Sequence, residues 1–138
     1  MCTRLRKGIG LITPGVLAQY RVLSGILQGK FGLDFGQGPI LNAREESLHG
    51  FWHKKDAQRG IIEVDEFYEK NVGFGMDGPM KVGCLYMPSH NFVIVTTAAN
   101  NVVLPYHHRM PLIIGDEAAW LNHGHVLHGG HNLKTIAA

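Results

Sequence analysis

Long apolar runs are absent from this 138-residue sequence. A membrane-spanning helix needs about 18 such residues in a row, and no stretch of the sequence approaches that length. Cations near the start precede an apolar stretch, as they do in a secretory signal, but glycines and a proline interrupt it. We therefore expect a protein without membrane segments and without a signal peptide.

The sequence also has few cysteines and a small net charge. The two cysteines are Cys2 and Cys84, and one pair in a chain of this length does not indicate the disulfide framework of a secreted protein. Thirteen Lys and Arg against eleven Asp and Glu give a formal net charge of +2, too small to capture nucleic acid by bulk electrostatics. The cytoplasm is the expected location, and any nucleic-acid site must be a local patch.

The overall composition is typical of one globular domain. With 45% hydrophobic and 17% charged residues, the chain is expected to fold over 1–138 as a single domain and as a monomer. Its 18 glycines and nine histidines favour a loop-rich site over a simple helical bundle.

Strand patterns dominate the local structure that the sequence predicts. Runs rich in β-branched and aromatic residues predict strands over 61–64, 67–69, 81–87, 92–97 and 111–114. Helical spacing predicts short helices over 47–58 and 116–121, the second capped by Asp116. Residues 16–27 fit neither pattern clearly, 31–39 predict a loop, and 121–138 are expected to form a loose tail. The expected fold class is α+β, rich in strands.

Three patterns that imitate functional sites have better structural explanations. The glycines from Gly73 to Gly78 have dinucleotide-binding spacing, but Pro79 and a strand-like run follow them, so no nucleotide cofactor is expected. The C-terminal histidines lack the cysteines or carboxylates that complete a zinc set, so no metal is expected. Cys84 lies within a strand pattern and is assigned to the core.

Cys2 differs from Cys84 because of its position. If Met1 is removed, which is usual before a small residue, Cys2 offers a free α-amine and a thiol on adjacent carbons. Their ordinary pKa values, about 7.7 and about 8.5, leave a useful fraction of each nucleophilic at neutral pH. Such a pair reacts with an aldehyde to form an imine and then a thiazolidine ring. The alternative is that a cysteine stands there by accident in a frayed terminus.

Other polar residues could assist such chemistry. Arg44 could clamp a phosphate and Asn42 could bind a sugar oxygen, although helix capping and a surface ion pair would also explain them. Glu69, beside aromatic residues, could act as a general acid or could simply point outward from an edge strand. His107 could shuttle protons while Arg109 holds either structure or phosphate.

Seven short sequence blocks follow one another over nearly the whole chain. They are Met1-Cys2, Lys30-Phe-Gly-Leu33, Asn42-Ala-Arg44-Glu-Glu, Glu66-Phe-Tyr-Glu69, Phe92-Val-Ile-Val-Thr-Thr-Ala98, His107-His-Arg-Met-Pro111 and Trp120-Leu121. Each block alone is a weak signal, but in this order they resemble the SRAP family, the SOS-response-associated peptidases or abasic-site processing proteins.

The resemblance implies a mixed or antiparallel sheet of open, barrel-like form with a groove for single-stranded DNA. It also implies that Cys2 captures the aldehyde of an abasic site as a thiazolidine crosslink in the DNA damage response. Asn42, Glu69 and His107 would complete the catalytic set. Arg4, Arg44, Arg109 and Trp52 would bind DNA, the last by stacking, as Phe51 and Phe67 could. The protein would then be nucleoid-associated when bound to DNA, with no cofactor.

The chain departs from the family pattern in several places. Thr3 and Glu66 each replace a glycine, Lys70 replaces a tryptophan, and the chain is shorter than typical members. Two alternative functions stay open at this stage. One is a thiol peptidase, acting on its own N-terminus or on a partner, with Cys2 as nucleophile. The other is a module that binds single-stranded DNA without covalent chemistry.

Overall fold

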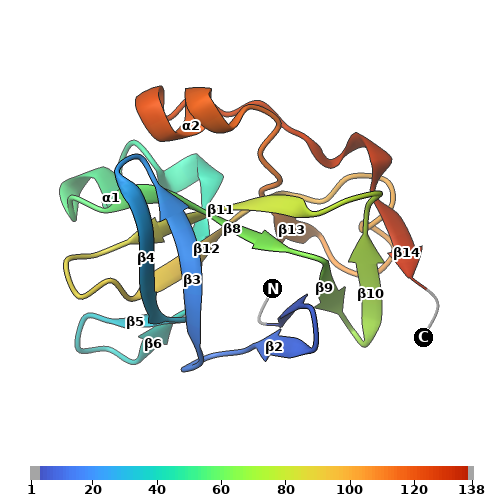
Figure 1. Ribbon diagram of the computed structural model, residues 1–138, viewed down its shortest axis with the longest axis horizontal. Helices are drawn as coiled ribbons and strands as arrows, with labels where there is room; N and C mark the ends of the chain where they lie inside the picture. The colour runs from blue at the N-terminus through green and yellow to red at the C-terminus, as the bar shows by residue number, and fades with distance from the viewer. Residues whose placement is uncertain (1–3, 137–138) are drawn as a thin grey trace.

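Two β-sheets packed face to face form the body of the protein (Figure 1). The structure is a computed structural model, and it describes residues 4–136. The first sheet has the strand order β14-β10-β9-β1-β2 and is antiparallel throughout. Its strands are β1 (Leu5–Lys7), β2 (Gly10–Ile12), β9 (Glu66–Glu69), β10 (Val72–Gly75) and β14 (Lys134–Ile136).

The second sheet has the order β13-β12-β11-β8-β3-β4, with β7 paired in parallel to β12. Its strands are β3 (Leu17–Val22), β4 (Gly25–Lys30), β7 (Asn42–Arg44), β8 (Gln58–Val64), β11 (Met80–Tyr86), β12 (Phe92–Ala98) and β13 (Arg109–Pro111). A small ribbon, β5 (Leu33–Asp34) with β6 (Pro39–Ile40), lies apart from both sheets. The sheets are mixed and antiparallel and do not close into a barrel, which confirms the predicted strand-rich α+β class.

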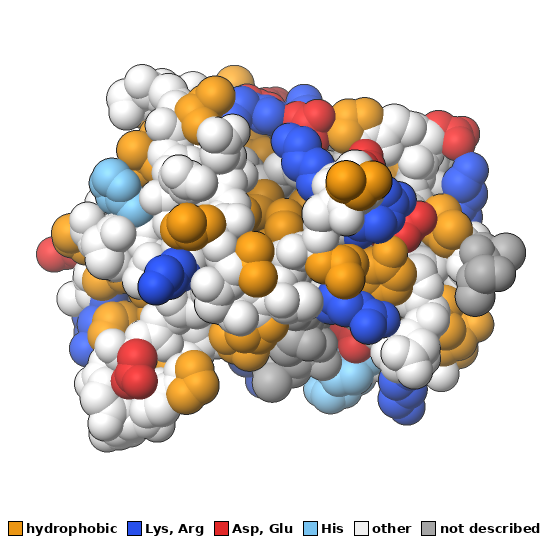
Figure 2. All heavy atoms as spheres, turned by 60° about the horizontal axis from the view of Figure 1, so that its bottom comes forward, with side chains coloured by type: hydrophobic (Ala, Val, Ile, Leu, Met, Phe, Trp, Pro, Cys, Tyr) orange, Lys and Arg blue, Asp and Glu red, His pale blue; other side chains and the backbone are white. Residues whose placement is uncertain are grey.

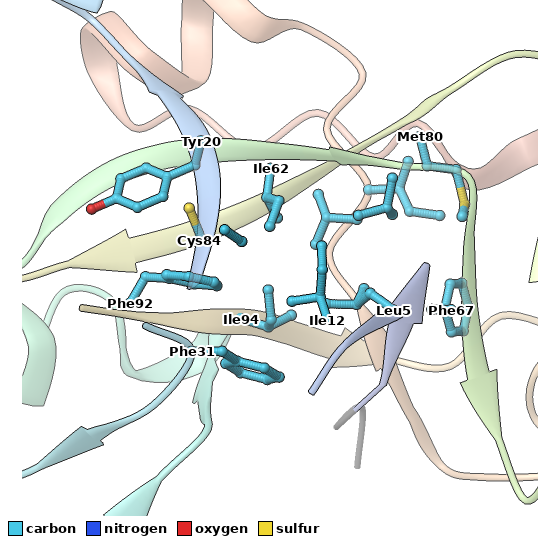
Figure 3. Close-up of a cluster of buried hydrophobic side chains, with 14 of the residues drawn as sticks. Leu5, Ile12, Tyr20, Phe31, Ile62, Phe67, Met80, Cys84, Phe92 and Ile94 are labelled. Atoms are coloured by element: carbon cyan, nitrogen blue, oxygen red, sulfur yellow. The ribbon is translucent and has the colours of Figure 1, made fainter. Parts of the chain in front are cut away.

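Two hydrophobic clusters lie on opposite faces of the larger sheet. The first fills the space between the sheets and joins Leu5 and Phe67 of one sheet to Tyr20, Ile62 and Phe92 of the other (Figure 3). The second lies on the outer face, under α1 (Phe51–Lys54) and α2 (Glu117–His123). Strand β12 contributes alternate residues to the two clusters, which explains its apolar run from Phe92 to Val95.

The second cluster depends on Trp120 of α2. Its indole Nε1 donates to Gly60 O at 2.9 Å, so a buried polar atom is satisfied within the apolar layer. The predicted helix over 116–121 is confirmed, since Asp116 caps it by accepting from Ala119 N at 3.0 Å. Gly124, with a φ of 67°, ends it in the left-handed conformation.

One helix prediction was wrong, and one segment without a clear pattern proved to be a hairpin. The helix expected over 47–58 is a 3₁₀ turn, η1 (Glu45–Ser47), followed by the single α-helical turn α1, because Gly50 interrupts with non-helical angles and Asp56 has a φ of 56°. The ambiguous residues 16–27 form the β3–β4 hairpin.

The C-terminal segment is not loose in the part that the structure describes. After the 3₁₀ turn η2 (Gly130–Asn132), β14 pairs with β10 and Leu133 is buried. Cys84 is fully buried in the inter-sheet core, as predicted, and burial raises the pKa of its thiol. Within residues 4–136, no helix is long and apolar enough to cross a membrane.

Candidate functional site

Asn42 and Arg44 lie on β7, and its pairing with β12 sets the direction of their side chains. Asn42 is opposite Ile94 and Arg44 is opposite Thr96. Ile94 belongs to the inter-sheet core, so the half-buried Asn42 faces the space between the sheets. Ala43 lies between them and is buried in the cluster on the other face.

Glu69 reaches the same space from the other sheet. It ends β9 with 4% of its surface exposed, and alternation puts it on the same face as Phe67 of the inter-sheet core. The outward position considered from the sequence is therefore wrong. A carboxyl group and an amide, Glu69 and Asn42, face the inter-sheet space from opposite layers.

His107 lies in the segment between β12 and β13, and its ring is oriented by the backbone. Its Nδ1 accepts from the backbone N–H of Arg109 at 2.9 Å, and the ring stacks on His108 with centroids 4.5 Å apart. In the neutral ring this leaves the proton on Nε2. Nδ1 also lies 3.2 Å from Arg109 O, which can accept a hydrogen bond from the N–H of the charged ring. Both protonation states therefore have a backbone partner.

Arg109 is buried and bound to the turn η1 and to β12. Its guanidinium donates to Glu46 at 2.6 and 2.9 Å and to Thr96 O at 2.9 Å. This bidentate pair lowers the pKa of the Glu46 carboxyl to about 2. Of the two roles considered for Arg109, these contacts support the structural one. Arg44, by contrast, is 65% exposed and meets Glu46 only at 3.5 Å, so it can turn toward a phosphate.

The exposed aromatic surface includes only one of the three rings that the sequence suggested, Phe51. Trp52 is 5% exposed and belongs to the core, as does Phe67, so neither ring presents a face to solvent. Phe51 is 46% exposed and packs with Phe35, which is 38% exposed, at a centroid distance of 6.2 Å. The Nζ of Lys55 lies 4.8 Å from the Phe35 centroid.

Phe35 could not be singled out from the sequence, because its only signal there is a phenylalanine within a glycine-rich segment. Together with Phe51 and Lys55 it forms an exposed platform of two rings and one cation, lining a pocket of about 330 Å³ beside the β5–β6 ribbon. Figure 2 shows that the face turned toward the viewer carries Lys and Arg side chains interspersed with hydrophobic ones.

Arg4 lies at the start of the described chain, against β9. Its guanidinium carbon is 4.6 Å from the Tyr68 centroid, and Tyr68 N donates to Arg4 O at 3.1 Å. Tyr68 in turn donates to Glu66 at 2.6 Å, and Arg6 contacts Glu66 at 3.0 Å. Arg6 holds the pKa of Glu66 below its usual value, and Glu66 raises the pKa of Tyr68. The glutamate that replaces a family glycine is therefore neutralised within the sheet.

Cys2 lies outside the described residues. In the sequence it stands two residues before Arg4, whose backbone contacts Tyr68, the neighbour of Glu69. In the described part of the chain, no group of three His, Cys, Asp or Glu side chains could hold a metal ion.

Comparisons with known proteins point to one family. Residues 32–131 match the model of a family described as SOS response associated peptidase (SRAP). That range includes Asn42, Glu69 and His107 and excludes Cys2 and Arg4. A comparison with curated proteins gave no match.

The fold is also similar to that of a solved structure. A phage-related protein from Bordetella bronchiseptica superimposes with a TM-score of 0.62 at 19% sequence identity, covering 81% of this chain and 68% of that chain. At this identity the similarity concerns the fold alone.

Proposed function

This chain belongs to the SRAP family of DNA-damage-associated proteins, and from that membership we propose that it binds single-stranded DNA and captures abasic sites covalently through Cys2. The observation that carries the proposal is the position of Glu69. Its buried carboxyl group faces the inter-sheet space from the strand that pairs with Arg4, two residues after Cys2 in the sequence.

The proposed chemistry needs no cofactor. Once Met1 is removed, the α-amine of Cys2 adds to the aldehyde carbon of the ring-opened abasic sugar, and loss of one water gives an imine. The thiol sulfur then adds to the imine carbon while its proton passes to the nitrogen. The product is a thiazolidine in which carbon–sulfur and carbon–nitrogen bonds both link protein to DNA.

Glu69 and His107 are the proposed proton-transfer groups. Glu69 would protonate the departing hydroxyl during imine formation, and its burial limits competition from bulk water. His107 would donate or accept at Nε2, since Nδ1 is held by the backbone at Arg109. With one proton-transfer group on each side of the reaction, Glu69 and His107 would support both closure of the thiazolidine ring and its reopening.

DNA binding would use an amide, a cation and the aromatic platform. Asn42 would bind an oxygen of the open sugar, and the exposed Arg44 would bind the flanking phosphate. Arg4 would contact a second phosphate. Bases beside the lesion would stack on Phe35 and Phe51.

The experiment is a denaturing gel of protein mixed with a single-stranded oligonucleotide that carries one abasic site. We expect a heat-stable band that Cys2→Ala abolishes and that Cys84→Ala preserves, because the Cys84 thiol is buried. Release of a new amine from added peptide, with no band, would instead indicate a peptidase. Salt-sensitive binding with no band would indicate a non-covalent module. The proposed setting is the cytoplasm, with a monomer that associates with the nucleoid through its DNA.

A further inference from the structure

A second cluster of cationic and titratable groups lies on the opposite face of the larger sheet from Asn42 and Glu69. It surrounds a small pocket of about 90 Å³ between α1 and α2. The pocket contacts Trp52 and Trp120 of the outer-face core, and its polar lining is His49, His53, Arg59 and His123.

Arg59 is the fixed charge of this pocket. Its Nε donates to Trp120 O at 2.7 Å, which holds the guanidinium near the C-terminal end of α2. A side chain at Gly124 would place its Cβ 3.1 Å from the Arg59 guanidinium, so the glycine leaves room for it. Within residues 4–136, Arg59 has no ion pair, and no Asp or Glu lines the pocket.

Three imidazoles from separate segments complete the cluster. His49 precedes α1, His53 lies within it, and His123 is the last residue of α2. All three side chains are exposed, and histidine is the side-chain type that can carry a positive charge at mildly acidic pH. The ring of His125 lies beside that of His123, with centroids 5.5 Å apart, and it adds no negative charge.

Acidic groups of the neighbouring elements do not offset these charges. Asp56, just after α1, is outside the pocket lining, as are the cations Lys54 and Lys55. Glu117 of α2 is bound by Arg21 at 2.8 Å. The pocket therefore holds one permanent positive charge and three imidazoles that can each add another, with no carboxylate in its lining.

We propose that this pocket binds a tetrahedral oxyanion of the phosphate class. A guanidinium fork with several imidazole donors matches such a group, and the volume admits one phosphate and no nucleoside. The ligand is either free phosphate or the phosphate at the end of a nucleic-acid strand. The inference does not depend on the proposed crosslinking, because the pocket shares no residue with that site.

The test uses sulfate, whose charge does not change in the relevant pH range, with the Cys2→Ala protein. NMR signals of the His49, His53 and His123 rings should shift saturably, with a dissociation constant at least about tenfold lower near pH 5.5 than near pH 8. A variant with all three changed to Gln should lose this pH dependence. The control His131→Gln alters an exposed histidine outside the pocket and should keep it.

Arg59 is tested separately because its change could disturb α2. Arg59→Lys keeps the charge and Arg59→Gln removes it, so binding near pH 8 should persist in the first and disappear in the second. If Arg59→Gln does not fold, the triple Gln variant still tests whether the pocket binds the anion. Equal, non-saturating shifts at all histidines would overturn the proposal, as would unchanged binding in the triple variant.

Two further arms identify the source of the phosphate. If a 5′-phosphorylated oligonucleotide displaces sulfate and the same oligonucleotide without the phosphate does not, the ligand is the phosphate at a strand end. Displacement by inorganic phosphate alone would indicate a free ligand. Failure of both to displace bound sulfate would contradict a phosphate site.

Discussion

The guanidinium of Arg109 donates two hydrogen bonds to the carboxylate of Glu46, at 2.6 and 2.9 Å. Glu46 lies in η1, two residues after Arg44, and Arg109 lies two residues after His107. The pair therefore connects the segment that carries the proposed DNA-binding arginine to the segment that carries the proposed proton-transfer histidine. The site's two halves are held together by this ion pair and by the contact of Arg109 with Thr96 O.

We expect Arg109→Met to destabilise the fold by about 2 kcal/mol, because charge-assisted hydrogen bonds to Glu46 and Thr96 are lost. Urea denaturation at neutral pH measures this. Arg44→Met is the matched control: its contact with the same carboxylate is exposed and 3.5 Å long, so a change below about 0.5 kcal/mol is expected. Equal effects of the two variants would contradict the structural role of Arg109.

Glu46 should make stability depend on pH in the acidic range. Its pKa in the folded protein is about 2, below the ordinary value near 4.5, so the unfolded chain takes up the proton first. The stabilisation is complete above about pH 4.5 and is lost as the pH falls toward 2. Urea midpoints across this range should fall less steeply for Glu46→Gln than for the unaltered protein. Parallel curves would show that the ion pair does not couple to folding.

Glu69→Gln should slow crosslink formation by about 10²-fold or more, because the amide cannot transfer the proton that imine formation requires. Single-turnover rates with an abasic oligonucleotide provide the measurement. Glu66→Gln is the matched control, since Glu66 lies on the other face of the same strand and is engaged by Arg6. A rate loss confined to Glu66→Gln would refute the assignment.

Phe51→Ala should weaken binding of undamaged single-stranded DNA by about 1–2 kcal/mol, because one stacking surface is removed. Since the ring is half exposed, the folded protein should lose little stability. Fluorescence anisotropy gives the affinity, and Leu23→Ala, an exposed apolar side chain of the β3–β4 turn, is the control. If both changes have the same effect, the aromatic platform is not the binding surface.

Strands β8, β9, β11 and β12 were predictable because their signals are local. In β12, Phe92 to Thr97 are buried on both faces of the sheet, and the apolar run from Phe92 to Val95 is typical of such a strand. The prediction of a helix over 47–58 was wrong because Gly50 interrupts the helical spacing of Leu48 and Trp52. Trp52 is buried by packing in the outer-face cluster, and this burial does not require a continuous helix.

The site was predictable in part. Motif order suggested Asn42, Glu69 and His107, and strand alternation supports the inward position of the first two. The role of Arg109 depends on a carboxylate 63 residues away, a pairing that no local pattern contains. The exposure of Phe35 likewise depends on where the β5–β6 ribbon meets α1, so only the three-dimensional structure separates it from the buried Trp52.

Covalent capture through Cys2 is tested by the intact mass of the protein, alone and after incubation with an abasic single-stranded oligonucleotide. We expect a protein lacking Met1, and an adduct whose mass is the sum of protein and DNA less one water, resistant to borohydride and absent with Cys2→Ala. A protein that lacks Met1 and forms no adduct would contradict it.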